Sequence, residues 1–384
     1  MDFGSRPLED LVTPNTHISL TSILQRTYRG EKVLVTGHNG FVGSWLTLVL
    51  ASAGAEVTGL SLACEPGGLA EALHLADLVN TVEGDIRDLA TLQRVFANAQ
   101  PTTVFHLAAQ AKVLDSFADP LLTFDTNVMG TANVLESLRQ QPSVRSCIVV
   151  TSDKCYATGA TSHVETDPLG GDDPYSASKA AAELVAHAYR TSFFTAAGPA
   201  VATTRAGNIL GGGDWAEHRI VPDCVRAFRN GKPVVLRRPE ARRPWQHVLD
   251  AVAGYVRLGD ALSRDGSPFA QAWNFGPASS DAVTVRELVT QLTQRWRQRV
   301  GDALDPEVEG HPLAERSTLV LDSGKAHAGL GWRPILDLAS TIDWTITWYG
   351  EATTSSHFNA RTATLSQIEA FLKKDGEVAH RRHN

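Results

Sequence analysis

The chain has 384 residues, of which 43% are hydrophobic and 20% charged, a composition typical of a globular protein with a large core. Its formal net charge of −7 excludes a broad basic surface for nucleic acid or for an anionic membrane. The cysteines, Cys64, Cys147, Cys155 and Cys224, have neither C-x-x-C nor zinc-type spacing, so we expect reduced thiols and no metal centre. The N-terminal segment lacks the apolar core of a secretory signal, and no apolar run reaches the roughly 20 residues of a membrane span. We therefore expect a cytoplasmic protein.

Short apolar runs rich in β-branched residues alternate with helical patterns, after an aperiodic polar stretch at residues 1–30. Such runs predict strands that are buried on both faces of a sheet. Their alternation with helices predicts an α/β fold with a doubly wound parallel sheet and right-handed crossovers. We predict strands at 32–37, 56–62, 103–109, 147–153 and 200–208, and helices at 41–53, 120–140 and 176–194.

The first predicted strand runs directly into the glycine-rich segment "VTGHNGFVGSW". Glycines between a strand and a helix allow a tight turn, let the backbone approach a pyrophosphate, and place the phosphate charge at a helix N-terminus. In this context the segment predicts a dinucleotide site on a Rossmann-like domain. The residues that we expect at this site are Gly37, Asn39, Gly40, Phe41, Val42 and Gly43.

The choice between NAD and NADP depends on the end of the second predicted strand. An acidic residue is expected there to hold the adenosine ribose, but Ser61 occupies the position and no arginine is near to hold a 2′-phosphate. We expect NAD, and the sequence leaves NADP open. Asp85 in "GDIRD" is placed either to accept from the adenine amino group or to be an ordinary turn residue. The other candidate cofactor contacts are Ile86, Leu107, Ala108 and Ala109.

A carboxylate and an ammonium, Asp153 and Lys154, stand side by side in "TSDKCY", where the fourth predicted strand ends. The pair is either a solvated turn or an acid and a base held for chemistry. Opposed proton-transfer roles require the surroundings to push the two pKa values apart. An exposed aspartate at about 4 and an exposed lysine at about 10.4 would each be in the wrong protonation state. A catalytic pair therefore requires a buried strand end.

The segment "DPYSASK" places Tyr175 and Lys179 on one face of a helix, since they are four residues apart. A nearby ammonium stabilises a phenolate and draws the tyrosine pKa from about 10 toward neutrality. The tyrosine can then remove a proton from an alcohol that is being oxidised. The motif Y-x-x-x-K is common by chance, and it gains weight here because it follows the glycine-rich turn and the strand that ends at Ser152.

The alternation loosens after residue 208, into the loop "GGGDW", a helical pattern at 219–229, a short strand in "PVVLRR" and an amphipathic helix at 284–300. A last helical pattern, "LSQIEAFLKK", lies in the tail. We predict an N-terminal extension at 1–30, a dinucleotide-binding domain at 31–208, a smaller mixed substrate lobe at 209–350, and a C-terminal helix and tail at 351–384.

These motifs, together with "HLAAQ", "TNVMGT", "RAGN", "RPWQHV" and "WNFGP", resemble the extended short-chain dehydrogenase/reductase superfamily over most of the chain. Within it the chain looks like the NAD-dependent epimerase/dehydratase family. The combination of "TSDKCY", "GGGDW" and "RPWQHV" is most similar to the cytidine-type nucleotide-sugar 4,6-dehydratases. The resemblance implies a lyase that binds NAD and a nucleotide sugar, and a homodimer formed through the helices at 120–140 and 176–194.

The resemblance also implies a role for each catalytic candidate. Tyr175 takes the proton of the sugar 4-hydroxyl as hydride passes from C4 to the cofactor, while Lys179 holds the ribose and Ser152 shares the hydroxyl. Lys154 removes the C5 proton and Asp153 protonates the departing 6-hydroxyl, after which hydride returns to C6. The expected reaction converts CDP-glucose to CDP-4-keto-6-deoxyglucose.

Two alternatives remain at this point, an NDP-sugar 4-epimerase or reductase on the same scaffold, and a non-catalytic dinucleotide sensor. The Asp153–Lys154 pair argues against an epimerase, which needs no acid and base at this place. Tyr175 and Lys179 argue against a sensor.

Substrate contacts are implied by the resemblance in the same way. Asn208 is matched to a diphosphate contact, and Arg243 and His247 are matched to the nucleotide-phosphate region, where a guanidinium fork suits a diphosphate. Asn127 is matched either to the substrate or to helix geometry. The segment that contains His163 is expected to lie over the sugar.

Overall fold

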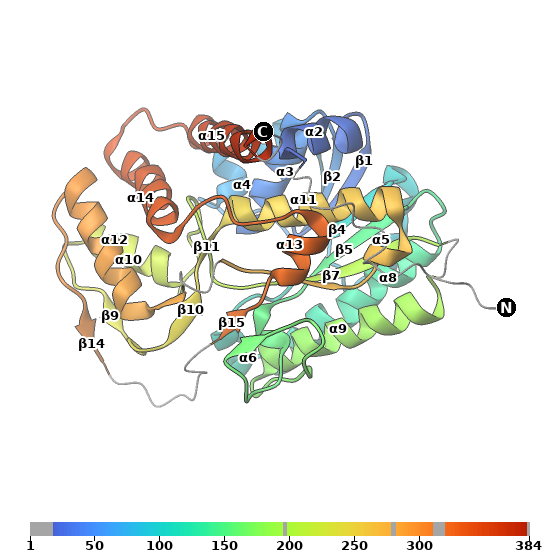
Figure 1. The fold of residues 1–384 in the computed structure, drawn as a ribbon, viewed down its shortest axis with the longest axis horizontal. Coiled ribbons are helices and arrows are strands. Elements are labelled where there is room, and N and C mark those ends of the chain that lie inside the picture. Colours follow the sequence, from blue (N-terminus) through green and yellow to red (C-terminus); the bar gives the residue numbers. More distant parts are fainter. Residues whose placement is uncertain (1–17, 195–197, 278–281, 310–318, 382–384) are drawn as a thin grey trace.

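A parallel sheet forms the centre of the protein (Figure 1). The computed structural model describes residues 18–194, 198–277, 282–309 and 319–381. Within these residues the sheet has seven strands in the order β12-β7-β5-β4-β1-β2-β3, and all neighbours are parallel. The predicted doubly wound α/β fold is therefore confirmed. The strands are β1 (Lys32–Thr36), β2 (Glu56–Ser61), β3 (Asn80–Glu83), β4 (Thr103–His106), β5 (Ser146–Val150), β7 (Ala200–Ala206) and β12 (Ala272–Phe275).

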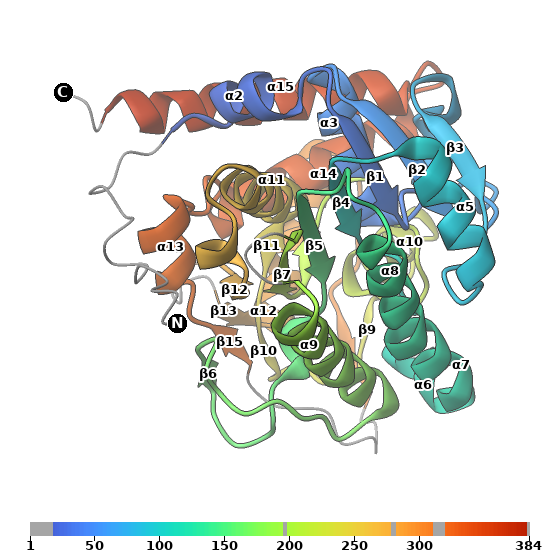
Figure 2. The same ribbon diagram turned by 90° about the vertical axis from the view of Figure 1, so that its right-hand side faces the viewer.

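Helices cover both faces of the sheet (Figure 2). Successive strand residues point to opposite faces, so Val33 and Val35 of β1 pack in one apolar cluster and Leu34 packs in the other. This burial on both sides explains why the strands read as continuous apolar runs. The layers contain α3 (Phe41–Ser52) and α11 (Val248–Asp265) on one face, and α5 (Leu89–Ala99), α8 (Gly130–Arg139) and α9 (Pro174–Ser192) on the other.

The single helix predicted at 120–140 is divided in the structure. A π-helical segment, η3, interrupts it, and a further short helix precedes it. Asp119 caps the first part, and Pro120 occupies its first turn, where its missing N–H costs nothing. The segments are α6 (Val113–Ala118), α7 (Pro120–Phe124), η3 (Asp125–Met129) and then α8.

Residues 209–350 contribute to the sheet domain as well as to a separate lobe. Helix α11 packs against β5 and β7, and β12 is an edge strand of the sheet, although both lie in the range predicted for the substrate lobe. Two further elements of this range, η5 (Ser267–Phe269) and α13 (Gly324–Leu330), pack against α11 and the β7–β12 side of the sheet. Other elements stand beside the sheet (Figure 1). The remaining elements of the range are β8 (Ile209–Leu210), α10 (Ile220–Arg229), β9 (Val235–Leu236), β10 (Arg242–Pro244), β11 (Gln246–His247), β13 (Ala282–Thr284), α12 (Val285–Arg299), β14 (Glu307–Val308), β15 (Val320–Leu321) and α14 (Leu338–Thr354).

The two terminal segments lie side by side (Figure 2). Arg257 of α11 forms a buried ion pair of 2.7 Å with Asp375, which also accepts a hydrogen bond from the backbone N–H of Leu20. Residues 18–30 of the predicted extension are thus integrated into the fold, whereas residues 1–17 lie outside the described residues. The remaining elements are α2 (Leu20–Ile23), η1 (Leu24–Tyr28), α4 (Leu69–Ala72), η2 (Leu75–Asp77), β6 (Ser162–His163) and α15 (Ala360–His380).

Candidate active site

The catalytic candidates from separate motifs meet at the carboxyl ends of β5 and β7. Asp173 caps α9 with its side chain and Pro174 begins the helix, so Tyr175 lies in the first turn and Lys179 in the next. Both side chains are buried, with exposed fractions of 8% and 6%. The ammonium of Lys179 donates to the carbonyl of Val150, the last residue of β5, at 3.4 Å. This contact ties the helix to the strand end that precedes Ser152.

The pKa of Tyr175 differs from the value expected from its neighbour. Burial raises this pKa to about 12, and a hydrogen bond with the Ser152 hydroxyl opposes the rise. Burial also lowers the pKa of Lys179 to about 8. The predicted lowering of the tyrosine pKa is therefore wrong for this structure, because removal of the phenolate from water raises the pKa more than the Ser152 hydroxyl and the Arg219 charge lower it. The hydroxyl of Ser152 is the contact that favours proton loss.

The carboxylate of Asp153 is held in one position at this strand end. Ser152 Oγ donates to one of its oxygens at 3.0 Å, and Asn208 Nδ2 donates to the other at 3.3 Å. The carboxylate lies against Gly207, where an added Cβ would come within 1.9 Å of Oδ2. Glycine is required here because no side chain fits between the backbone and the acid.

Burial shifts the pKa of Asp153 in the direction that a general acid needs. The side chain is only 2% exposed, and desolvation raises its pKa, while the charges of Lys154 and Arg243 act in the opposite direction. The backbone N–H of Lys154 also bonds Ser152 Oγ at 3.2 Å, which closes the short 3₁₀ turn. The acid of the predicted pair is therefore buried, whereas Lys154 beside it is half-buried.

Two of the predicted substrate contacts lie close to this acid. Asn208 has a left-handed backbone with φ of 49° and points its amide at Asp153. Arg243 on β10 is 5% exposed, and its charge lowers the Asp153 pKa against burial. The structure thus brings Asn208 and Arg243 to the acid.

The other two predicted substrate contacts are used inside the fold. Asn127 donates to Ser178 Oγ at 2.8 Å and exchanges hydrogen bonds with the backbone of Gln110, so its amide fixes the packing of η3. His247 is completely buried, accepts from the N–H of Leu249 and meets two tryptophan rings. The structure does not bring these two side chains to the catalytic residues.

The ring of His163, in the segment that is expected to lie over the sugar, packs into the fold. Its ring is 2% exposed and stacks on Tyr156, with centroids 4.5 Å apart and planes at 6°. Its Nδ1 bonds Asp167 at 3.1 Å. The segment therefore packs this histidine inward, because an aromatic face is available beneath it.

One buried acid beside the site is absent from the sequence-based predictions. Glu183 on α9 is 3% exposed and pairs with Arg205 of β7 at 2.8 Å. It lies one helical turn beyond Lys179 and two beyond Tyr175. A charged residue at this spacing in an alanine-rich helix was the available signal.

The glycine-rich turn fits a dinucleotide. Gly37 has φ of 76°, and a Cβ there would lie 2.6 Å from the backbone nitrogen of Ala108; at Gly43 it would lie 2.0 Å from the carbonyl oxygen of Gly37. Gly40 precedes α3, and no side chain caps this helix. Its N-terminus therefore suits a phosphate. The adjoining candidate residues are Phe41 and Val42 in the first turn of α3, and Leu107 and Ala109 after β4.

The end of β2 is occupied by a local network. Ser61 Oγ accepts from the backbone N–H of Asn39 at 3.2 Å and bonds Nδ1 of His38 at 3.0 Å. Burial lowers the pKa of His38 to about 4, so the ring is neutral at pH 7. The hydroxyl thus stabilises the glycine-rich turn from the position where an acidic residue was expected.

Asp85 and Ile86 follow β3 and have different surroundings. The carboxylate of Asp85 forms a 2.6 Å ion pair with Arg87, which lowers the Asp85 pKa and keeps it an acceptor. Ile86 is buried, and its side chain fills the space over Gly130. Ile86 therefore packs against the start of α8.

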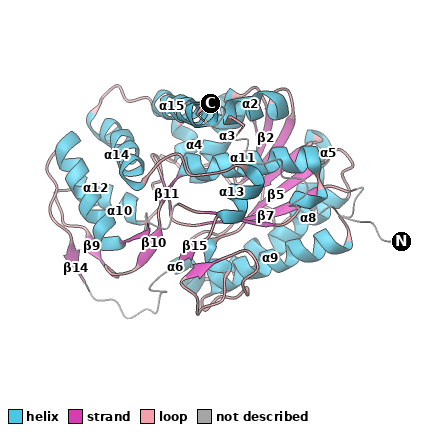
Figure 3. Cartoon of the chain, viewed as in Figure 1, coloured by secondary structure: helices cyan, strands magenta, loops and turns pink. Residues whose placement is uncertain are grey.

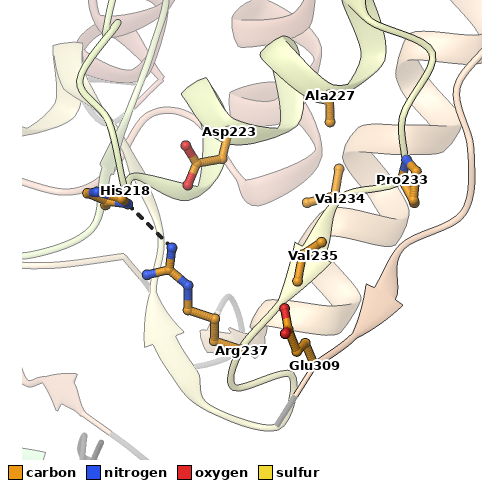
Figure 4. A pocket seen from close by; sticks show the side chains of 8 residues that line it. All are labelled: His218, Asp223, Ala227, Pro233, Val234, Val235, Arg237 and Glu309. Carbon is orange, nitrogen blue, oxygen red and sulfur yellow. Dashed lines mark hydrogen bonds between the residues drawn. The ribbon is translucent and has the colours of Figure 1, made fainter. Parts of the chain in front are cut away.

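A separate cavity of about 350 Å³ lies in the lobe between α10 and β9 (Figure 4). His218 and Arg237 face one another across one end of it, with His218 Nδ1 3.3 Å from a guanidinium nitrogen. None of the catalytic candidates contributes to its wall. The lining residues are His218, Asp223, Ala227, Pro233, Val234, Val235, Arg237 and Glu309.

Helices and strands are distributed over both the sheet domain and the lobe (Figure 3). In the described part of the chain, no helix combines the length and apolar character needed to cross a membrane. The same residues contain no group of three or more His, Cys, Asp or Glu side chains arranged to hold a metal ion.

Comparison with known proteins identifies the class to which this fold and site belong. A family model described as the NAD dependent epimerase/dehydratase family matches residues 33–276, and the chain belongs to this family. It is 42% identical over 330 residues to the CDP-glucose 4,6-dehydratase of Salmonella typhimurium, an alignment that covers 84% of this chain and 91% of that protein. The resemblance inferred from the motifs is therefore confirmed.

Solved structures agree with this assignment. A double mutant of dTDP-glucose 4,6-dehydratase from Streptomyces venezuelae, with NAD and DAU bound, superimposes with a TM-score of 0.70 at 26% identity, covering 83% of this chain and 96% of that one. The UDP-glucose 4-epimerase of Thermus thermophilus, in complex with NAD, gives a TM-score of 0.69 at 28% identity, covering 83% and 98%. The shared fold thus accommodates both elimination and epimerisation.

Proposed function

We propose that the chain is an NAD-dependent nucleotide-sugar 4,6-dehydratase that converts CDP-glucose to CDP-4-keto-6-deoxyglucose. The observation that carries this proposal is the buried carboxylate of Asp153, with its raised pKa, next to Lys154 and hydrogen-bonded to Ser152. The similarity to a CDP-glucose 4,6-dehydratase supports the cytidine nucleotide.

The glycine-rich turn and the open N-terminus of α3 hold the dinucleotide in this proposal. When bound, NAD accepts hydride from the sugar and later returns it. Ser61 leaves the end of β2 without a charge, and the NAD complexes of related enzymes favour NAD over NADP.

Oxidation at C4 uses the Ser152 and Tyr175 pair. The ionised side chain of Tyr175 removes the proton of the 4-hydroxyl and becomes the phenol, and the Ser152 hydroxyl shares a hydrogen bond with that sugar oxygen. The ammonium of Lys179, one helical turn beyond Tyr175, holds the ribose of the cofactor in this proposal. Its contact with the Val150 carbonyl holds it at the strand end.

Elimination uses the adjacent acid and base. Once C4 is a ketone, the C5 proton is acidic, and the amine of Lys154 removes it. Asp153 gives its proton to the 6-oxygen, which leaves as water. Asn208 and Gly207 hold the carboxyl in place for this transfer.

The test is to incubate the protein and NAD with CDP-glucose, dTDP-glucose, UDP-glucose and a GDP-hexose. We expect a 4-keto-6-deoxy product, formed fastest from CDP-glucose. A C4 epimer as the product would support the epimerase instead. Bound NAD without turnover of any sugar would support the sensor.

We also propose that the protein is a cytoplasmic homodimer. Free thiols at all four cysteines agree with a reducing compartment.

Large apolar side chains are exposed on α6, α7, η3 and α9, and they offer a face for a second copy. Light scattering measures the molar mass and so tests the dimer. A variant with Leu121→Glu and Leu184→Glu places charges on this face, so the proposed dimer should dissociate. The exposed side chains are Phe117, Leu121, Leu122, Phe124, Met129 and Leu184, together with Phe193 directly after α9.

A further inference from the structure

The carboxylate of Glu183 joins three elements behind the catalytic residues. It accepts from Thr151 Oγ1 at 2.5 Å, from Thr203 Oγ1 at 2.7 Å and from the Arg205 guanidinium at 2.8 Å. Thr151 follows β5, and the other two donors lie on β7. Each of the four residues is at most 7% exposed. One acid on α9 thus bonds both strands whose ends form the site.

Glu183 is ionised although it is buried. Arg205 and the two threonine hydroxyls lower its pKa against the effect of burial. An ionised carboxylate only accepts, so both hydroxyls point their protons at it. Thr151 has one other acceptor, the carbonyl of Thr204 at 3.1 Å, but the charged and shorter contact takes the proton.

The hydrogen bond from Thr151 to Glu183 connects the catalytic turn with helix α9. Thr151 directly precedes Ser152 and Asp153, while Glu183 is on the same helix as Tyr175. The bond therefore fixes the distance between the turn that carries the acid and the helix that carries the phenol. The contact of Lys179 with Val150 is the second link between the same two elements.

We propose that Glu183 is a positioning residue for the dehydration and acts through Thr151. The inference rests on the proposed function. The carboxylate of Glu183 also accepts a hydrogen bond from Thr203, but Thr203 lies within strand β7 and is not followed directly by a catalytic residue. The two threonines therefore separate positioning from general support of the fold.

The experiment compares Thr151→Val with Thr203→Val. Each change removes one hydroxyl from the same carboxylate and leaves the ion pair with Arg205 in place. For T151V we expect kcat with CDP-glucose to fall by about tenfold or more, with KM unchanged, because a small displacement of reacting groups is costly. T203V should keep the wild-type kcat while its Tm falls as much as that of T151V. Thr151→Ser, which retains the hydroxyl, should recover kcat.

Equal kcat values for T151V and T203V, or no recovery in T151S, would overturn the inference. Crystal structures of the two valine variants give a readout that needs no substrate. The turn at 152–155 should move relative to α9 in T151V and stay in place in T203V. A wild-type protein that dehydrates no sugar refutes the proposed function, whereas an unmoved turn in T151V refutes the positioning role.

Discussion

Burial acts in opposite directions on two residues of the candidate site. Desolvation disfavours the charged form of either group, so the pKa of Asp153 rises and that of Lys179 falls. The first effect favours the protonated form of Asp153, the group that must give a proton away. The lowered pKa of Lys179 means that this side chain begins to lose its charge near physiological pH.

We expect Lys154→Ala to separate oxidation from elimination. The variant retains Tyr175 and Ser152, so hydride still leaves the sugar, but no amine removes the C5 proton. Reduced cofactor should then accumulate on mixing with CDP-glucose, and product formation should fall by about 100-fold or more. Absorbance of the reduced nicotinamide measures the first effect. The exposed Lys232→Ala serves as the control, and wild-type turnover in K154A would contradict the role.

We expect the alkaline limit of activity to follow Lys179. Its pKa is lowered to about 8, so the ammonium is present below that pH and is lost above it. Cys155 and Glu183 face the ammonium and oppose the shift, and the neutral ring of His106 is its further titratable neighbour. The kcat should fall about tenfold per pH unit above 8, as for the loss of one required proton.

A matched control exists for this pH profile. Burial also lowers the pKa of Lys325 to about 8, but its ammonium bonds Gln271 and the carbonyl of Ala272, away from the catalytic residues. Lys325→Met should keep the alkaline limb. A kcat that stays level from about pH 8 to about pH 10 would exclude Lys179 as its source.

The catalytic candidates were readable from the sequence because their motifs are contiguous. Tyr175 and Lys179 share one helix, and Ser152, Asp153 and Lys154 share one turn. Whether Asn127 and His247 reach a ligand was not readable in this way. Their polar atoms bond partners whose positions only the packed helices determine.

At the scale of elements, the junction after β7 limits the position of the acid. Gly207 allows the carboxyl of Asp153 to lie against the backbone. Strand β7 is predictable from the sequence. The close approach of the Asp153 carboxyl to Gly207 is not, because it depends on how β5 and β7 align.

Gly207→Ala should therefore displace the acid. The added Cβ would stand 1.9 Å from Asp153 Oδ2, so the carboxyl must move. We expect kcat to fall by about 100-fold with little change in NAD affinity, since a displacement near 1 Å has this effect on a reacting group. Gly301→Ala is the control, because nothing lies within 4 Å of its added Cβ. Equal kcat values in the two variants would refute the steric argument.

At the scale of the whole molecule, the alternation of strands and helices in the sequence predicts the parallel sheet. It does not predict that β12 and α11 also belong to the sheet domain. Strand β12 and helix α11 come from a range whose pattern had loosened, and they join the sheet only because its outer strand offers an unpaired edge and an apolar face. The docking of α2 on α15 was also unpredictable, since its contacts span 355 residues.

Asp375→Asn should destabilise the protein strongly. The change leaves Arg257 charged and buried without its anion, at a cost of about 3–5 kcal/mol in the free energy of unfolding. Denaturant titration measures the loss. Asp305→Asn breaks the exposed pair with Arg297 and should cost less than about 1 kcal/mol. Similar losses in both variants would contradict the role of the buried pair.

The contact between Asp375 and Leu20 also sets an order of events during synthesis. The ribosome makes α2 long before α15, so the apolar side chains of Leu20 and Ile23 lack this neighbouring helix until α15 has been made. A nascent chain that stops before α15 therefore leaves these side chains less covered than the folded protein does, and truncation before residue 375 would have the same effect.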